Sequence, residues 1–381
     1  MLRYLPVYNR SIFQHTPILY HLITFARPIT TTIIMVAEKP TLHWGIIATG
    51  LISSWFVEDI ALPRPESEAN HIIQAIGSSS QEKGKKFVET HLPGTSPTIG
   101  TYEQVYADPK VDIIYIGTPH AFHKQNCLDA IKHGKHVLCE KAFTLNAAEA
   151  KEVFDAAAKK GVFVMEAMWT RFFPLTMTLQ KLLHADKVIG DVKRVFCDFG
   201  LKQDIASLPA DSRLKNPALG AGSLLDIGIY SLTWGLVGLG QQTEKPKVVA
   251  WQHLVDGVDI ASSMILSFSQ GQQGILTSTT LKKTARPFCR IEGTKGTVVV
   301  EGVAASLPGS FTVHLDDDEE PKKYDFKNPG RGFYWEADAV AVDIKAARTQ
   351  SEVMPWAETI RVLEILDEVR RQGGAKFPQE E

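Results

Sequence analysis

Between residues 43 and 165, short apolar runs alternate with helical segments, and small or polar residues follow the apolar runs. Five runs have the length and composition of buried strands: His43–Ala48, His71–Ile76, Val111–Gly117, Val137–Cys139 and Val162–Met165. Strand–helix repetition at this spacing requires right-handed crossovers, which bring the strands into one parallel sheet. The sequence therefore predicts an α/β domain over residues 35–165, with a Rossmann-type parallel sheet at its centre.

The turn after the first strand has part of a dinucleotide-binding fingerprint. That fingerprint has one glycine for the tight turn, a second where the backbone approaches a pyrophosphate, and a small residue for helix packing. These places hold Ala48, Gly50 and Ser53, so only the middle glycine is kept. We expect a dinucleotide cofactor to lie against this turn, at Thr49, Gly50, Leu51 and Ile52.

The end of the second strand bears on the choice between NAD and NADP. NAD-selective sites usually have Asp or Glu at this place, where it accepts the ribose hydroxyls. This sequence has Gly77-Ser78-Ser79-Ser80 instead. Ser79 and Lys83 could bind the 2′-phosphate of NADP, although an arginine would be the better fork for it. NADP is therefore the expected cofactor, and NAD is the less favoured alternative.

Two further strand ends bring polar residues to the same edge of the sheet. The third strand ends in Thr118-Pro119-His120, with His123 one helical turn beyond, and Val137–Cys139 ends in Glu140-Lys141. The histidines could bind a metal, but with no carboxylate nearby they favour helix capping or contacts at the cofactor edge, and we expect no metal. A lysine after a buried strand is usually a solvated loop residue. Because the strand ends share one edge, we instead assign these residues to the cofactor site: Thr118, Pro119, His120, His123, Glu140 and Lys141.

Residues 166–231 contain a second group of candidate site residues. Trp169 and Arg171 stand in the run Trp-Thr-Arg-Phe-Phe-Pro, which suits either a domain-junction core or a pocket wall. Asp226 and Tyr230 follow a Gly-rich segment and are four residues apart, so on a helix both project from one face. They could be a helix cap and a core tyrosine, or a polar pair that faces a pocket.

From residue 247 onward the pattern changes to β-structure. The expected strands are Lys247–His253, Ile260–Ser269, Gln273–Thr280, Phe288–Gly293 and Thr297–Gly302, and the turns between them suit antiparallel hairpins. Helices are expected at about 334–348 and 356–371. Residues 166–381 are therefore predicted to form an α+β domain with a large, mostly antiparallel open sheet, which would bind substrate. One face of that sheet takes helices, and the other requires water or a partner subunit.

Composition and charge narrow the functional classes. A chain of 381 residues is too long for one ordinary core, so two domains are expected. The net charge of −2 gives no electrostatic reason to bind nucleic acid or anionic lipid. Four scattered cysteines suit a reducing compartment.

Residues 1–34 differ from the rest of the chain. They contain Arg3, Arg10 and Arg27 but no acidic residue, as in a mitochondrial presequence, although their prolines interrupt any long amphipathic helix. No apolar run approaches the ~20 residues of a membrane span. An alternative is an upstream start, with the working chain beginning at Met35. We expect an extension outside the fold and a cytoplasmic protein, or a mitochondrial one if the segment is a presequence.

Several of these motifs together resemble the Gfo/Idh/MocA oxidoreductases. The similar segments are the turn at Gly45–Ser53, Thr118-Pro119-His120, the run 134–141, and Gly-x-x-x-Asp-Ile-Gly at 222–228. Residues 165–174 and Asp-Ile-Gly-Ile-Tyr are similar to the branch of dimeric dihydrodiol dehydrogenases and NADP-dependent D-xylose 1-dehydrogenases. The resemblance runs from Trp44 to Gln379. The sequence departs from the family at Ala142, where the family has proline, at Ala48, and at Ser79, where many relatives have arginine.

The resemblance implies an enzyme in which Lys141 and Tyr230 flank the carbon that gives up hydride. Asp226 would hold substrate hydroxyls or orient Tyr230, and the remaining pocket residues would be Trp169, Arg171 and Phe333, the first two also touching the cofactor. A nearby ammonium would favour the phenolate by up to about 4 kcal/mol, so we expect Lys141 to lower the pKa of Tyr230.

The activity implied is NADP-dependent oxidation of an aldose such as D-xylose at C1, forming the 1,5-lactone. The sequence leaves two alternatives open, which are a trans-1,2-dihydrobenzene-1,2-diol dehydrogenase and a non-catalytic NADP-binding repressor of a sugar regulon. A homodimer through the C-terminal sheet is expected by analogy.

Overall fold

The computed structural model of this chain describes residues 38–380 except 243, 318 and 319. Residues from Lys39 onward form one compact unit. The predictions made for residues 1–34 lie outside the described residues.

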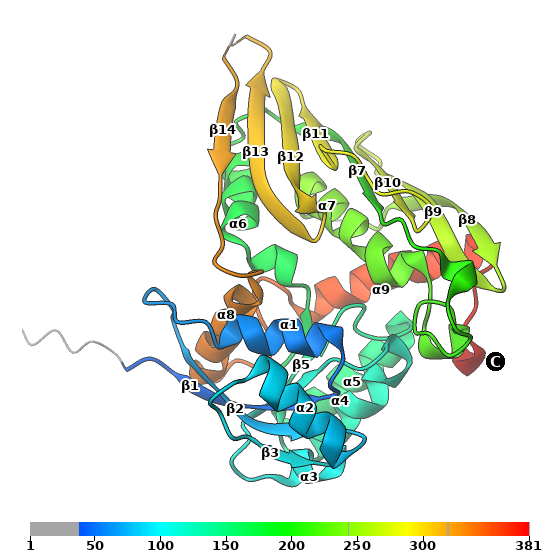
Figure 1. The fold of residues 1–381 in the computed structure, drawn as a ribbon. Coiled ribbons are helices and arrows are strands. Elements are labelled where there is room, and N and C mark those ends of the chain that lie inside the picture. Colours follow the sequence, from blue (N-terminus) through cyan, green and yellow to red (C-terminus); the bar gives the residue numbers. More distant parts are fainter. Residues whose placement is uncertain (1–37, 243, 318–319, 381) are drawn as a thin grey trace, which may run out of the picture. The chain divides into compact units, whose positions relative to one another are not determined.

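The first half of this unit forms a six-stranded sheet in which every strand is parallel to its neighbours (Figure 1). Its strands are β1 (Thr41–Ile47), β2 (Asn70–Gly77), β3 (Thr98–Gly100), β4 (Ile113–Ile116), β5 (His136–Glu140) and β6 (Val164–Ala167). The strand order is β3-β2-β1-β4-β5-β6. Successive strands are therefore added on one side of β1 as far as β3 and on its other side from β4 onward. Ligands bind at such switch points, outside the carboxyl ends of the strands. The predicted Rossmann-type sheet is confirmed, and its last strand extends two residues beyond the boundary expected at residue 165.

Helices connect these strands: α1 (Leu51–Ile60), α2 (Gln81–His91), α3 (Tyr102–Ala107), α4 (His123–Lys132) and α5 (Ala147–Lys160). Local sequence signals explain both ends of α5. The side chain of Asn146 accepts a hydrogen bond from the backbone N–H of Glu149 at 3.0 Å, and Gly161 ends the helix with a φ of 71°.

The second half contains an eight-stranded sheet of order β14-β13-β12-β11-β7-β10-β9-β8. Its strands are β7 (Val192–Gly200), β8 (Lys247–Val255), β9 (Val258–Ser267), β10 (Gln273–Thr279), β11 (Cys289–Gly293), β12 (Gly296–Ala304), β13 (Leu307–Leu315) and β14 (Lys322–Asp325). All neighbours are antiparallel except β7 and β10, which are parallel. This confirms the mostly antiparallel sheet.

No strand is predicted at β7, although β7 lies inside the sheet. Lys193, Arg194 and Asp198 interrupt its apolar pattern. Arg194 points to the open face, where it pairs with Glu292 of β11 at 2.7 Å. Strands β3, β13 and β14 also have no predicted counterpart.

Four helices complete this half: α6 (Pro174–Gln180), α7 (Ile229–Leu239), α8 (Phe333–Lys345) and α9 (Trp356–Gly373). Helices α6, α7 and α9 lie on one face of the large sheet, whereas α8 packs on α1 and α9 also packs on α5 (Figure 1). The last two helices therefore return to the first half of the chain. The stretch Pro217–Leu239 is long and apolar enough to cross a membrane, but most of it is buried inside the fold, as expected of a core helix.

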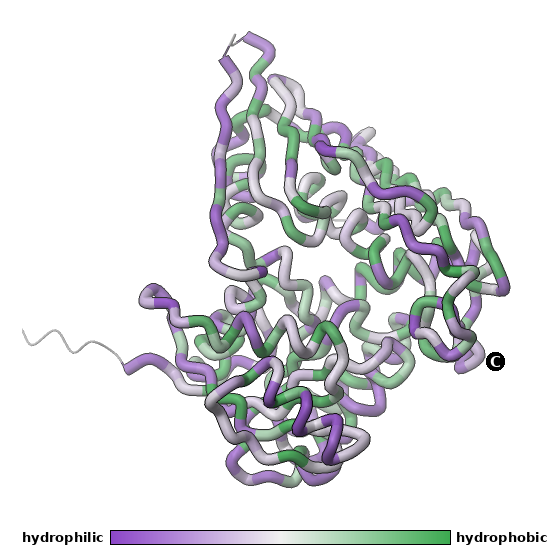
Figure 2. The backbone as a smooth tube through the Cα atoms, viewed as in Figure 1, coloured by the Kyte–Doolittle hydropathy of each residue, from purple (hydrophilic) through white to green (hydrophobic). Residues whose placement is uncertain are grey.

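The other face of the large sheet is partly apolar. Along β8, exposed residues alternate with half-buried or buried ones, and hydrophobic and hydrophilic colours alternate along the strands of this sheet in Figure 2. Val249, Trp251 and Ile265 on this face are 54%, 59% and 41% exposed. An antiparallel sheet with one helix-covered face and one open face matches the prediction.

Candidate active site

The turn between β1 and α1 leaves the start of α1 open. Gly50 precedes the helix in an extended conformation, and a Cβ added there would meet no other atom within 4 Å. The first backbone N–H groups of a helix have no partner inside the helix and attract anions. This turn can therefore accept a pyrophosphate, as the sequence predicts.

Ala48 adopts a left-handed conformation in this turn, with a φ of 77°. Glycine adopts that conformation without strain, whereas an L-residue costs about 1–2 kcal/mol there. Ala48, at the place of the fingerprint's first glycine, thus has a backbone conformation that glycine would adopt without strain.

A cavity of about 420 Å³ lies between this turn and the second half of the chain. Many predicted site residues line it. From the β1–α1 turn these are Gly50, Leu51 and Ile52, and from the ends of β4 and β5 they are Thr118, Pro119, His120, Glu140 and Lys141. From the second half they are Trp169, Asp226 and Tyr230. The cavity therefore brings together predicted site residues from both halves of the chain, such as Lys141 and Asp226.

Lys141 and Asp226 form an ion pair inside this cavity. The Lys141 Nζ donates to the backbone oxygen of Asp226 at 2.6 Å and to its Oδ1 at 3.1 Å. Burial alone would raise the pKa of Asp226, but the charges of Lys141 and Arg213 hold it well below its usual range. Asp226 is therefore ionised, and it accepts hydrogen bonds from the ammonium group of Lys141.

Tyr230 lies beside this pair with its hydroxyl bound to Trp169. The indole Nε1 of Trp169 donates to the Tyr230 oxygen at 2.7 Å. Burial raises the pKa of Tyr230 well above 10, and the nearby Glu140 carboxyl adds to the effect. The expectation that Lys141 lowers this pKa is therefore wrong for this arrangement. The Lys141 Nζ is 5.2 Å from the centre of the Tyr230 ring, but its hydrogen bonds go to Asp226.

Glu140 is a buried carboxyl on the cofactor side of the cavity. Its Oε1 accepts a hydrogen bond from the Tyr115 hydroxyl at 2.6 Å, and its Oε2 accepts one from the backbone N–H of Lys141 at 3.2 Å. Burial raises the pKa of Glu140 to about 7. Burial thus favours the neutral form of this carboxyl, and the Tyr115 hydroxyl and the Lys141 N–H fix its orientation.

His120 and His123 brace the backbone around Lys141. The His120 nitrogens lie 2.9 Å from the Gly220 oxygen and 3.2 Å from the Lys141 oxygen. Those of His123 lie 2.9 Å and 2.8 Å from the oxygens of Ala142 and Thr118. Burial lowers the pKa of both, that of His120 to about 3, so each is a neutral ring that donates to one carbonyl. Among residues 38–380, gaps aside, no metal-binding group of three His, Cys, Asp or Glu side chains occurs.

The other predicted site residues do not line the cavity: Thr49, Ser79, Lys83, His123, Arg171 and Phe333. Ser79 and Lys83 are exposed at the end of β2 and the start of α2. Arg171 pairs with Glu358 of α9, and Phe333 is buried behind Trp169, on which it stacks at 4.1 Å. The family resemblance implies that Arg171 and Phe333 line the pocket, whereas the structure places both outside it. Arg171 is held by its ion pair with Glu358, and Phe333 packs on Trp169, which lines the cavity.

Several cavity residues have no counterpart in the prediction: Trp55, Phe199, Leu201, Gln203, Arg213 and Ser306. Phe199 lies near the end of β7, and Leu201 and Gln203 follow at alternate positions just after it. The sequence pattern does not predict this strand. The Pro- and Gly-rich segment 209–222 was the one available signal for a loop that carries Arg213 to the cavity.

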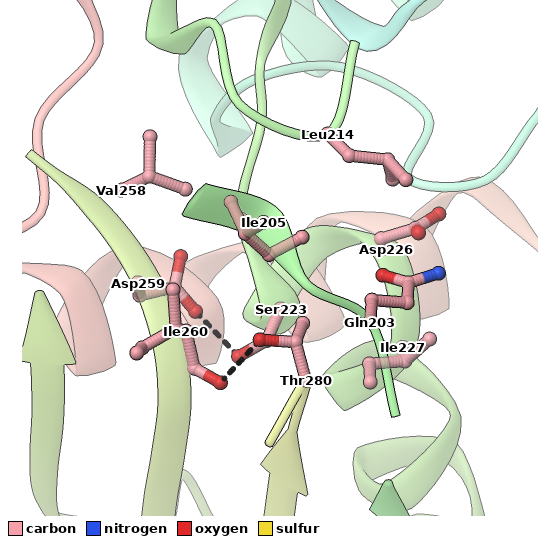
Figure 3. Close-up of a pocket in the computed structure, with 11 residues that line it drawn as sticks. Gln203, Ile205, Leu214, Ser223, Asp226, Ile227, Val258, Asp259, Ile260 and Thr280 are labelled. Carbon is pink, nitrogen blue, oxygen red and sulfur yellow. Dashed lines mark hydrogen bonds between the residues drawn. The ribbon is translucent and has the colours of Figure 1, made fainter. Parts of the chain in front are cut away.

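A smaller hollow lies next to the cavity, with Gln203 and Asp226 at its edge (Figure 3). Its buried Asp259 accepts hydrogen bonds from Ser223 Oγ at 2.8 Å, Leu224 N at 2.7 Å and Ser262 Oγ at 2.9 Å. Gly222 has a φ of 143°, and a Cβ there would lie 2.1 Å from the Asp259 carboxylate. Asp259 thereby anchors the segment that leads into Asp226, which explains the glycine in front of it.

Two family comparisons cover most of the described chain. Residues 42–168 match the oxidoreductase family with an NAD-binding Rossmann fold, and residues 177–299 match the GFO/IDH/MocA C-terminal domain. A D-xylose 1-dehydrogenase (NADP(+)) of Hypocrea jecorina is 36% identical over 370 residues, which cover 89% of this chain and 94% of the relative. This chain belongs to the Gfo/Idh/MocA oxidoreductase family. The family predicted from its motifs is thus confirmed.

Another relative and two solved structures are similar over nearly the same length. A trans-1,2-dihydrobenzene-1,2-diol dehydrogenase of Sus scrofa is 35% identical over 347 residues, covering 89% of this chain and 99% of the relative. An aldose-aldose oxidoreductase of Caulobacter crescentus, complexed with glycerol, superposes with a TM-score of 0.75 at 25% identity, covering 88% and 98% of the two chains. A levoglucosan dehydrogenase structure has a TM-score of 0.74 at 19% identity, covering 88% and 97%, and shares the fold.

Proposed function

We propose that this chain is an NADP-dependent dehydrogenase that oxidises the C1 hydroxyl of an aldose such as D-xylose to the 1,5-lactone. The observation that carries the proposal is the meeting of Lys141, Asp226 and Tyr230 in one cavity with the open start of α1. Similarity to the NADP-dependent D-xylose 1-dehydrogenase supports the substrate class.

The residues around the β1–α1 turn fit a dinucleotide. The space in front of Gly50 lets a pyrophosphate approach the first N–H groups of α1. Ser79 and Lys83 are exposed at the end of the neighbouring strand, where a 2′-phosphate would lie. When bound, the nicotinamide accepts the hydride that leaves C1.

The side chains of the cavity would handle the proton of the C1 hydroxyl. Tyr230 is neutral while Lys141 is paired with Asp226, so a bound substrate must weaken the ion pair between Lys141 and Asp226. A sugar hydroxyl that donates to Asp226 would release the Lys141 ammonium toward the phenol oxygen. A unit charge about 4 Å away favours the phenolate by up to about 4 kcal/mol at an effective dielectric near 20. Tyr230 would then accept the proton, and Lys141 would stabilise the charge.

A dihydrodiol substrate is the second candidate. Trp169, Phe199 and Leu201 give one wall of the cavity an apolar surface that an aromatic-derived ring could contact. The similarity to trans-1,2-dihydrobenzene-1,2-diol dehydrogenases is nearly as high as that to the xylose enzyme.

Steady-state rates on a panel of aldoses and the dihydrodiol, each with NADP and with NAD, test the proposal. We expect the highest kcat/KM with an aldose and NADP. Lys141→Ala and Tyr230→Phe should each lower kcat at least about 100-fold, the usual contribution of a positioned acid or base. Lys124→Ala and Tyr324→Phe, which change the same residue types outside the cavity, should retain full activity. Near-normal turnover in either cavity variant would refute the mechanism.

We further propose a homodimer through the open face of the large sheet. The exposed Trp251, Val249 and Ile265 supply apolar surface on strands β8 and β9. Sedimentation velocity should give the mass of a dimer for the wild type and of a monomer for Trp251→Lys. A wild-type monomer at all concentrations would contradict the proposal.

We propose a cytoplasmic location, or a mitochondrial one if residues 1–34 act as a presequence. The three arginines of this acid-free segment support the alternative. Fluorescence microscopy of the tagged full chain and of a chain starting at Met35 would distinguish the two locations.

A further inference from the structure

We propose that Gln203 and Arg213 read the substrate hydroxyls beyond the reacting carbon, and so make the cavity selective for polyhydroxylated rings. This inference rests on the proposed dehydrogenase function. Both side chains line the cavity from the segment that follows β7.

The backbone of the segment around Gln203 is hydrogen-bonded to its neighbour, whereas the Gln203 side-chain amide has no partner among the described residues. Its backbone N–H donates to the Thr280 oxygen at 2.8 Å, and that of Leu201 donates to the Thr279 oxygen at 2.9 Å. Alternate residues of an extended segment point the same way, so Leu201 and Gln203 face the cavity while Lys202 is exposed outside it. The Gln203 amide lies beside Asp226 in Figure 3, and it makes no hydrogen bond within the part of the chain that the structure describes.

Arg213 is similarly available. Its Nη1 lies 3.4 Å from Asp226 Oδ1, an oxygen that already accepts from Lys141 at 3.1 Å. The side chain is 53% exposed, and a guanidinium has five N–H donors in a fixed fork. Most of these donors can therefore turn to a substrate.

The two substrate classes differ in what they offer these groups. In a trans-dihydrodiol the two hydroxyls are on adjacent carbons, and Lys141, Asp226 and Tyr230 suffice to bind both. The rest of that ring is hydrocarbon, so it would cover Gln203 and Arg213 without giving them a partner. An aldopyranose has further hydroxyls along the ring. A site built to bind a hydroxyl rejects an analogue that lacks it, because its polar groups are then left unpaired.

The test is a cycle that combines Gln203→Leu with the removal of single hydroxyls from the sugar. We would measure kcat/KM with NADP for D-xylose and its monodeoxy analogues in the wild type, in Gln203→Leu and in the control Lys202→Leu. When one particular hydroxyl beyond C2 is removed from the sugar, the kcat/KM of the wild type and of the control should fall about tenfold, the effect of one ordinary hydrogen bond. Removing the same hydroxyl should not lower the kcat/KM of Gln203→Leu any further. The ratio of its kcat/KM for xylose to that for the dihydrodiol should fall about tenfold relative to the wild type.

The outcomes separate this inference from the proposed function. If removing any one hydroxyl lowers kcat/KM equally in Gln203→Leu and in the wild type, the inference is overturned and the dehydrogenase function stands. A wild-type chain that oxidises no aldose overturns both. Thermal unfolding of the variants shows whether any loss of kcat/KM comes from misfolding instead. Arg213→Leu provides a second variant, and we expect it to raise KM for xylose more than it lowers kcat.

Discussion

Replacing Trp169 with phenylalanine isolates the hydrogen bond that orients Tyr230. Phenylalanine can keep a flat ring on Phe333, which stacks on Trp169 with an interplanar angle of 5°, but it removes the 2.7 Å bond from Nε1 to the Tyr230 oxygen. That bond favours the phenolate and so opposes the rise in the pKa of Tyr230 that burial produces. The variant should therefore make Tyr230 harder to ionise.

The size of this effect follows from ordinary hydrogen-bond energies. One net bond contributes about 1–1.5 kcal/mol, and 1.36 kcal/mol corresponds to one pKa unit. The ionised fraction of Tyr230 should then fall about tenfold at a given pH. The phenolate that remains is a stronger base, which recovers part of the loss, so kcat should fall about three- to tenfold.

The assay is the pH profile of kcat for aldose oxidation between pH 6 and 10. In Trp169→Phe, the increase of kcat on the alkaline side of the profile should occur about one pH unit higher than in the wild type. Trp356→Phe is the matched control, because its Nε1 donates to the Val164 oxygen at 2.8 Å outside the cavity. The control should lose a similar free energy of unfolding and keep the wild-type profile. An unshifted profile in Trp169→Phe would refute the role given to this bond.

Three further predictions concern stability and are measured by urea unfolding. Burial raises the pKa of Glu166 to about 7 from 4.5, so the folded state binds a proton that the unfolded state has lost, and stability falls as pH rises from 4.5 to 7. Glu166→Gln should therefore be up to about 3 kcal/mol more stable than the wild type at pH 8 and nearly equal at pH 5; the same difference at both pH values would contradict this. Ala48→Gly should add about 0.5–1 kcal/mol by removing the strain of a φ of 77°, and a loss of stability would disprove that reasoning. Arg64→Met should cost about 3–5 kcal/mol, because it leaves the buried Asp338 without the two bonds of 2.8 and 2.9 Å, whereas the exposed Arg194→Met should cost under about 1 kcal/mol.

The first half of the fold could be predicted because local pattern and topology agree there. Buried parallel strands are apolar on both faces, as in Ile113–Ile116, and the handedness of the crossovers places every strand end on one edge. Gly50, Thr118 and Lys141 could thus be assigned to one site from their order in the chain. The spacing of Asp226 and Tyr230 indicates only that both lie on one helix face, and the family resemblance is needed to assign them to the site. The segment Leu224–Gly228 is a π-helix that leads into α7.

The outer wall of the cavity could not be predicted in this way. Gln203 reaches it from the segment that follows β7, and β7 lies between β11 and β10. The apolar pattern of β7 is broken by residues on its open face, so the sequence does not predict this strand. Arg171 shows the opposite error. Its short spacing from Trp169 indicates a shared pocket, but Glu358, nearly 190 residues later, holds it outside the cavity.

Tyr230 shows why proximity alone does not determine the direction of a pKa shift. From the sequence, Lys141 and Tyr230 form a pair in which the ammonium acidifies the phenol. The structure adds Asp226, which takes the hydrogen bonds of that ammonium, and Glu140, whose charge disfavours phenolate. The resting cavity therefore keeps its phenol neutral. If Tyr230 accepts the substrate proton, the change that ionises it must come from the substrate, through the one carboxylate that a sugar hydroxyl and Lys141 can share. An alcohol that cannot donate to Asp226 should then bind without being oxidised.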